Sequence, residues 1–144
     1  MSPVFTAPLA VRWSDQDINR HVNNARIVTL LEEARLAAIA HWLGETGVPD
    51  PANPRVVASL SLDYLRPIDH GPQLTARVWV AGVGRTSYTV AYTLHQHGHV
   101  AARARTVLVQ MDPATGRSAP LPSTVRSSLN KVLVPQPCTE DERV

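Results

Sequence analysis

The chain has 144 residues, 44% of them hydrophobic and 18% charged, and carries a formal net charge of +2 at pH 7. That length is enough for one domain with its own core, and a weak basic balance without a block of Lys or Arg gives no reason to expect a nucleic-acid partner. No apolar run approaches a membrane span and no basic-then-apolar leader starts the chain, so neither a membrane partner nor secretion is expected. The single cysteine, Cys138, cannot form an internal disulfide, which favours a cytoplasmic location.

A polar stretch over residues 13–24 joins a predicted short strand, residues 8–13, to a predicted helix, residues 24–43. Asn23 or Asn24 stands where a helix N-cap belongs, and Gly44 stands where the helix should end. A helix start offers free backbone N–H groups and a positive dipole end, which can receive a developing oxyanion. Asp17 lies one short loop upstream, so the stretch has the minimum equipment for acyl-transfer chemistry. The same residue types are equally typical of an ordinary capped loop.

The helix pattern places apolar residues on one side and leaves Glu32, Glu33 and Arg35 on or beside the polar face, where solvation and local charge pairing are expected. After a proline-rich loop, the apolar period changes from helical to two. This alternation predicts strands over 56–64, 74–80, 88–94 and 100–111, with turns at 69–72, 82–85 and 97–98. In the first of these strands, the apolar face is predicted to be Val56, Ala58, Leu60, Leu62 and Tyr64. A short helix is predicted over 122–129.

Strands joined by short turns are antiparallel, and one long helix covers only one face of their sheet. The opposite face is predicted to carry a mixed set of side chains, namely Ser59, Ser61, Thr75, Arg77, Trp79, Thr89 and Thr93. A long antiparallel sheet with so little cover invites pairing between the edges of subunits, so we expect a homodimer or homotetramer. Residues 1–134 are expected to form a single domain and residues 135–144 a flexible tail.

Four motifs in this frame resemble the hot-dog-fold acyl-CoA thioesterases, and within them the 4-hydroxybenzoyl-coenzyme-A thioesterase type. The family carries a D-x-D-x-x-G-H-V-N-N-like loop, matched here by residues 15–24, and an E-x-A-R element, matched by residues 32–35. Residues 63–67 and 84–87 also look like the family, and the resemblance covers roughly residues 10–111. It implies an α+β hot-dog fold, in which a five-stranded antiparallel sheet wraps around one long helix.

Carried over by position, the resemblance makes Asp17 the catalytic carboxylate and the backbone N–H of Asn24 the donor to the thioester carbonyl. Asp17 is expected to act either as a nucleophile or as a general base on water, and the sequence leaves both open. His21 and Asn23 are candidate positioning groups. Arg20 stands where many members have glycine, and three roles stay open for it: it narrows the acyl pocket, reaches a substrate carboxylate, or faces solvent. Asp15 is interpreted as structural.

The resemblance also suggests where coenzyme A binds. Arg85, Thr86 and Ser87 match a family position that meets the nucleotide phosphates. Arg103 and Arg105 project to one side of the last strand and either add to that positive surface or form the polar face. His95, His97 and His99 straddle a glycine turn without a nearby carboxylate, so they are expected to be surface residues, and no metal or cofactor is expected.

The function indicated is hydrolysis of an acyl-CoA thioester to free acid and CoA. The alternatives are an acyl-ACP thioesterase or a hydratase on the same fold, and a non-catalytic module that binds acyl thioesters. The pairing of Asp17 with Asn24 favours the enzymes, because a pure binder does not need a carboxylate next to a thioester carbonyl.

Overall fold

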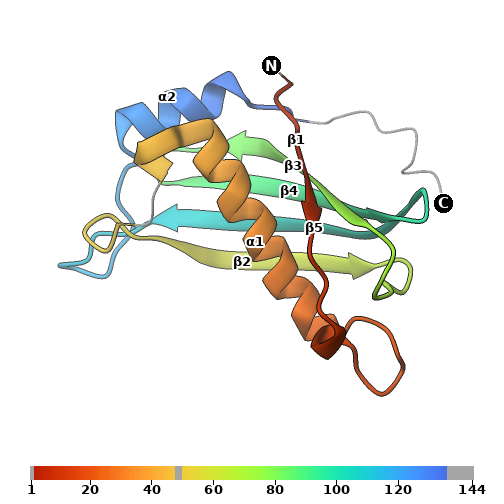
Figure 1. Cartoon of the computed structure of the whole chain (residues 1–144). Coiled ribbons are helices and arrows are strands. Elements are labelled where there is room, and N and C mark those ends of the chain that lie inside the picture. The colour runs from red at the N-terminus through yellow and green to blue at the C-terminus, as the bar shows by residue number, and fades with distance from the viewer. Residues whose placement is uncertain (1, 48–49, 136–144) are drawn as a thin grey trace.

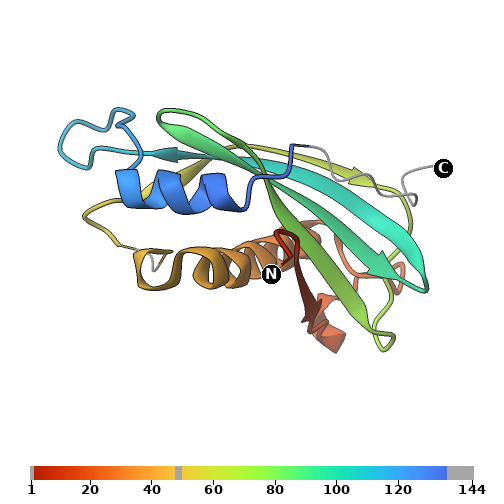
Figure 2. The same cartoon turned by 90° about the horizontal axis from the view of Figure 1, so that it is seen from above.

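The computed structural model describes residues 2–47 and 50–135, and within them the predicted antiparallel sheet and long helix are confirmed. Five strands lie in the order β1-β3-β4-β5-β2, and both α-helices lie on the same side of the sheet (Figures 1 and 2). The elements in chain order are β1 (Phe5–Leu9), the 3-10 turn η1 (Trp13–Asp15), α1 (Asn24–Leu43), the 3-10 turn η2 (Gly44–Gly47), β2 (Arg55–Tyr64), β3 (Leu74–Val83), β4 (Ser87–Gln96), β5 (His99–Gln110) and α2 (Ser123–Lys131). Of the predicted tail, residues 136–144 lie outside the described residues.

Helix α1 has the bounds that its sequence predicts. The Asn23 side chain caps it by accepting the Ala25 N–H at 2.9 Å, and Gly44 ends it with a positive φ of 57°, which glycine adopts without steric cost. The helix crosses the sheet diagonally (Figure 1). Ala34 and Ala38 are completely buried, because only a small side chain lets the helix approach the strands this closely.

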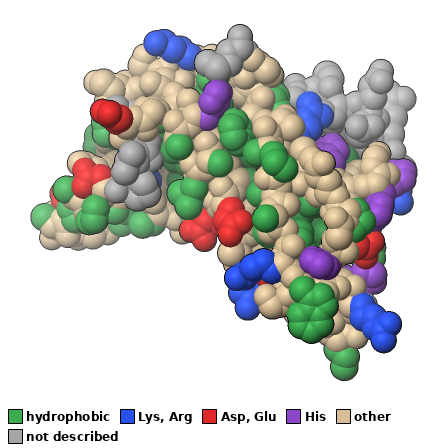
Figure 3. Space-filling view, in the orientation of Figure 1, with side chains coloured by type: hydrophobic (Ala, Val, Ile, Leu, Met, Phe, Trp, Pro, Cys, Tyr) green, Lys and Arg blue, Asp and Glu red, His purple; other side chains and the backbone are tan. Residues whose placement is uncertain are grey.

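The core lies between α1 and the helix-facing sides of the central strands. The helix-facing core positions alternate along β3 and β4 as predicted, and they are Leu74, Ala76, Val78, Val80, Tyr88, Val90, Tyr92 and Leu94. On the outer face of these strands Trp79, Ala91 and Thr93 are buried as well. One helix residue departs from the prediction. Arg35 is 8% exposed and points at β4, where its guanidinium contacts the Tyr92 hydroxyl, so it does not belong to the solvated face. Glu32 and Glu33 are exposed as predicted, and Figure 3 shows acidic side chains gathered over the middle of α1.

The first strand lies earlier than the predicted residues 8–13. It pairs with β3 over Phe5–Leu9, and the chain then turns through η1. The cause is local: the Asp15 carboxylate accepts the Arg12 N–H at 2.8 Å and the Arg12 guanidinium at 3.0 Å. These bonds hold the backbone in a capped turn and end the strand.

The predicted alternation of β2 is wrong at its start because the strand has a β-bulge at Ala58. The register with β5 shifts between Val57 and Ser59, so that Val57 lies opposite Leu108 on the helix side and Val56 lies opposite Val109 on the outer side. From Leu60 to Tyr64 the predicted faces are confirmed. A single extra residue thus exchanges the faces of the two valines.

The outer face of the sheet has the mixed composition that the sequence predicts. Cross-strand registers place Arg77 opposite Thr93, Thr93 opposite Arg103, and Arg103 opposite Asp63 on this face. Here the sheet is hollowed by a cavity of about 430 Å³ beside Trp79 and Arg105. Within the described residues, no helix combines the length and the apolar character needed to cross a membrane.

The close approach of α1 to the sheet predicts the effect of enlarging a buried alanine. Ala38→Leu should lower the free energy of unfolding by about 1–3 kcal/mol, because extra methylene groups have no space under the helix. Ala37→Leu is the matched control, since Ala37 is exposed on the same helix and its change should be nearly neutral. Chemical denaturation of both variants measures the difference, and equal stabilities would contradict the packing described here.

Candidate functional site

Residues 16–23, the site loop, connect η1 to α1 and project from one end of the sheet (Figure 1). The loop is closed by hydrogen bonds from the Asp17 N–H to the His21 carbonyl and from the Arg20 N–H to the Asp17 carbonyl, both 3.0 Å long. Arg20 adopts φ 61°, in the left-handed region that disfavours side chains. The tight turn therefore explains why glycine suits this position in the family that the sequence resembles. The Arg20 side chain is exposed.

Asp17 is half-buried, and its carboxylate is tied to the start of α1. One oxygen accepts the Asn19 N–H at 2.8 Å, and the other accepts the Asn23 side-chain amide at 3.3 Å. The same Asn23 side chain caps α1 through its Oδ1. One asparagine therefore holds the candidate catalytic carboxylate and the helix end in a fixed relation.

The first turn of α1 leaves one backbone donor free. The N–H groups of Ala25, Arg26 and Ile27 all bond to acceptors on Asn23. No acceptor among the described residues takes the N–H of Asn24. An unpaired N–H at the positive end of a helix can bind an anion, and the role of this N–H as donor to a carbonyl stays a prediction.

A cavity of about 290 Å³ brings these groups together. Its lining includes Asp17, His21 and Asn24, with Ile27 and Ile68 as apolar wall. The predicted site residues of the loop therefore share one space, apart from Asn23, which does not line the cavity and acts through its contact with Asp17.

Five lining residues, 64–68, come from the end of β2 and the segment after it, and sequence reasoning assigned no site role to two polar ones, Tyr64 and Arg66. The Tyr64 hydroxyl donates to the Asn24 carbonyl at 2.9 Å, so it braces the first turn of α1 from the sheet. Arg66 adds a positive charge to the cavity lining. The sequence did hold a signal for these two residues. The motif over residues 63–67 resembles the thioesterase family, although the resemblance gave that motif no function.

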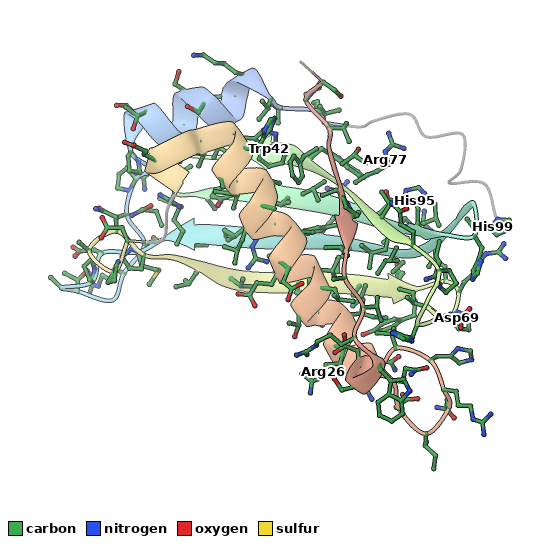
Figure 4. All side chains as sticks on the ribbon, viewed as in Figure 1. Arg26, Trp42, Asp69, Arg77, His95 and His99 are labelled. Atoms are coloured by element: carbon green, nitrogen blue, oxygen red, sulfur yellow. The ribbon has the colours of Figure 1, made fainter. Side chains whose placement is uncertain are left out.

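A third missed residue is Asp69, which lies at the same end of the sheet as His95 and His99 (Figure 4). Its carboxylate contacts His21 Nδ1 at 2.9 Å and His97 Nε2 at 3.2 Å. The expectation that these histidines lack a nearby carboxylate is therefore wrong for His97. The pKa of Asp69 is lowered by its contacts with His97 and then His21, so the carboxylate is an acceptor. In a neutral His21 this contact places the proton on Nδ1 and leaves Nε2 as an acceptor.

Asp15 has the structural role that the sequence suggests. It is buried, and its backbone carbonyl accepts the Asn23 N–H at 2.8 Å. The Arg12 backbone N–H that bonds to its carboxylate lowers the pKa of Asp15, with the Arg12 side chain adding to the effect. Asp15 thus anchors both ends of the site loop without entering the cavity.

The predicted nucleotide-binding residues lie elsewhere in the subunit. Arg85 and Thr86 form the turn between β3 and β4, with Ser87 starting β4. Ten residues of β4, spanning about 30 Å, separate this turn from the hairpin beside Asp69. A single subunit therefore does not bring the turn to the Asp17 cavity.

The remaining histidines do not assemble a metal centre. His95 bonds through Nε2 to the Thr93 hydroxyl at 2.8 Å, and His97 adopts φ 56° in the hairpin turn that the sequence predicts. Across residues 2–47 and 50–135, no group of three or more His, Cys, Asp or Glu side chains is placed to hold a metal ion.

Comparison with known proteins shows the superfamily to which the chain belongs. The sequence profile of the thioesterase-like superfamily matches residues 11–129, and the chain belongs to this superfamily. A thioesterase from Thermus thermophilus, complexed with coenzyme A and Zn, is 32% identical with a TM-score of 0.78 over 91% of this chain and 94% of that chain. A predicted thioesterase from Bacillus stearothermophilus is 27% identical with a TM-score of 0.84 over 94% of this chain and 99% of that chain.

The fold extends to more distant proteins. DHNA-CoA thioesterase from Staphylococcus aureus is 19% identical with a TM-score of 0.81 over 90% of each chain, a likeness of fold alone. No match was found among curated proteins. The sheet and helix arrangement is the hot-dog fold that the sequence predicts.

The Asp69 contacts predict a pH-dependent contribution to stability. Because the native pKa of Asp69 lies below its ordinary value of 3.8, its contribution is present above pH 3.8 and is lost as the pH falls through the native pKa. Asp69→Asn should therefore lower the free energy of unfolding near pH 6, and with it the melting temperature, by less than about 1 kcal/mol in free energy because the side chain is 42% exposed. Melting curves of both proteins should converge at pH values below 3.8. A gap that persists unchanged well below pH 3.8, where the native carboxyl group is protonated, would contradict an ionic role for Asp69.

Proposed function

We propose that the protein hydrolyses acyl-CoA thioesters, with an active site of the 4-hydroxybenzoyl-CoA thioesterase type. The observation that carries this proposal is the unpaired Asn24 N–H at the start of α1, which opens into the same cavity as Asp17. A thioester needs polarisation of its carbonyl and a nucleophile, and these two groups supply one each. Membership of the thioesterase-like superfamily supports the assignment.

In the proposed reaction the thioester carbonyl oxygen accepts the Asn24 N–H, which stabilises the negative charge that develops as the carbonyl is attacked. Asp17 either takes a proton from water, whose oxygen then bonds to the carbonyl carbon, or attacks that carbon itself to give a mixed anhydride that water later cleaves. In both routes the C–S bond breaks, and CoA leaves as a thiolate that takes up a proton. The products are the free acid and CoA.

Asn23 and His21 act on this reaction by positioning. Asn23 fixes the Asp17 carboxylate against the helix cap. His21 is oriented by Asp69, and its acceptor nitrogen is available to hold a water molecule in the cavity. A positional error of about 1 Å can reduce a rate a hundredfold, so both side chains matter without entering a bond change.

The proposed role of Asp17 predicts that Asp17→Asn stays folded and loses most turnover of acyl-CoA, by about a hundredfold or more. The amide cannot take a proton or attack, but it retains an oxygen for the Asn19 N–H. Release of free thiol, followed with a thiol reagent, measures the rate. Asp112→Asn is the matched control, since Asp112 lies in the loop after β5. Turnover near the wild-type rate in Asp17→Asn would reduce Asp17 to a loop residue.

We further propose that the protein is a homo-oligomer built on the edge of β2. This edge strand exposes apolar side chains, with Val56, Val57, Leu60 and Tyr64 between 39% and 49% exposed. A two-fold axis would pair two β2 strands antiparallel, continuing the sheet across both subunits and covering these side chains. In such a dimer, or in a tetramer of two such dimers, the edge of β2 that α1 leaves uncovered would pair with a strand of the partner.

Antiparallel pairing also bears on the nucleotide site. β2 begins at the end of the sheet near the Arg85 turn and ends at Tyr64 beside Asn24. Reversing one subunit against the other therefore sets the Arg85 turn of one copy near the Asp17 cavity of its partner. We propose that Arg85, Thr86 and Ser87 contact the CoA phosphates in this way, across the subunit boundary.

Light scattering should accordingly give a mass of two or four chains, and Leu60→Lys should shift it towards one. Activity should fall together with the mass, because the site is completed by the partner. Thr124→Lys adds the same charge on exposed α2 and should change neither. A stable monomer with full activity would contradict the interface and the shared site.

A further inference from the structure

Arg35 is a charged side chain inside the core. Its residue exposure is 8%, and it extends from the sheet-facing side of α1 towards β4. Arginine is almost never this buried unless its charge is paired and its donors are satisfied. Arg35 is buried without meeting that condition.

The protein contacts of the guanidinium are few and long. One Nη donates to the Tyr92 hydroxyl at 3.4 Å, and the other lies 3.6 Å from a carboxylate oxygen of Glu32, whose side chain is 58% exposed. The Nε atom is buried and has no partner among the described residues. A guanidinium has five N–H donors in a planar fork, so most of its hydrogen-bonding capacity is unused.

Arg35 lines a third cavity, of about 440 Å³, between α1, the start of β2 and β5. Leu36, Ile39 and Leu108 make its wall apolar, while Arg55 and the buried Tyr88 contribute polar groups. Burial raises the pKa of Tyr88, so its hydroxyl remains protonated and can donate. The cavity is therefore lined by hydrogen-bond donors on an apolar wall.

Two carboxylates also line this cavity, and neither fills it. Asp50 is held by its own loop, accepting the Ala52 N–H at 2.9 Å and the Asn53 amide at 3.1 Å. Glu32 is mostly in solvent and reaches Arg35 only at long range. A ligand carboxylate could accept two parallel N–H bonds from Arg35, which is the geometry that a guanidinium binds best.

The Arg35 cavity lies in line with the proposed active site. Asn24, Val28, Leu31 and Arg35 recur at spacings of three and four residues and so share one side of α1. Arg35 follows Asn24 at a distance of about 16 Å along the helix, at about 1.5 Å per residue. The two cavities share no lining residue, and apolar side chains lie between them: Val28 on α1 and Leu60 on β2 are each 39% exposed, and Leu31 is 2% exposed.

We propose that the Arg35 cavity binds a carboxylate at the far end of the acyl group, so that the preferred substrate is the CoA thioester of a dicarboxylic acid. The inference rests on the proposed thioesterase function. The thioester lies at Asn24 and Asp17, the methylene chain follows the apolar side of α1, and the second carboxylate pairs with the guanidinium. A hydrocarbon chain of the same length would leave the guanidinium with its long-range contact to Glu32 and with its buried Nε unpaired among the described residues.

Length-matched substrates test this. The values of kcat/KM are measured by thiol release for adipoyl-, suberoyl- and sebacoyl-CoA and for hexanoyl-, octanoyl- and decanoyl-CoA. With the wild-type protein, at least one dicarboxylic thioester should exceed its matched partner about tenfold or more. In Arg35→Met that ratio should fall to about one or below. Arg126→Met, which removes an exposed charge from α2, should keep the wild-type ratio.

Thermal melting of each variant separates a lost contact from a lost fold. Arg35→Lys provides a second test if Arg35→Met does not fold, because lysine keeps the charge without the planar fork. It should lower the dicarboxylic preference while leaving the rate on the fatty acyl thioesters close to wild type. Hydrolysis of both series without a preference, or a preference unchanged in the Arg35 variants, overturns the carboxylate subsite and leaves the thioesterase proposal standing. Absence of thiol release from every thioester overturns both.

Discussion

The packing of α1 against one face of the sheet is the constraint on which the rest of the molecule depends. The helix can lie this close because Ala34 and Ala38 are completely buried against the strands. Its position sets the place of its first turn, where the Asn24 N–H is left without an acceptor among the described residues. It also leaves the β2 edge uncovered, with apolar side chains on it. One packing arrangement thus creates both the proposed carbonyl-binding group and the exposed edge on which the proposed dimer is built.

Much of this arrangement was predictable because its signals are local. The bounds of α1 follow from an apolar stripe, an asparagine cap and a glycine stop, all found within a few residues. Four of the five strands follow from alternation, and the loop carboxylate Asp17 follows from its place before the helix. The resemblance of residues 15–24 to a known family then added a role for each group, and the cavity now shows Asp17, His21 and Asn24 in one space.

The predictions failed where contacts between distant residues or a backbone irregularity decide the outcome. The bulge at Ala58 exchanges the faces of Val56 and Val57, and no composition signal marks it. Asp69 was missed because its partners lie 48 and 28 residues away. Arg35 was placed on the solvated face because a helix pattern alone does not show how far its long side chain reaches under the helix. An apolar pattern locates a core, but it does not show which polar groups enter it.

The two histidine contacts of Asp69 also have a consequence for the order of folding. The carboxylate joins the site loop, the segment before β3 and the β4–β5 hairpin, three parts of the chain that are distant in sequence. Such contacts form late, because the entropy of closing long loops must be overcome before the contacts can form. The helix cap that holds Asp17 is local and can form early. A chain still emerging during synthesis would therefore have its carboxylate and helix end in place before the hairpin arrives to orient His21.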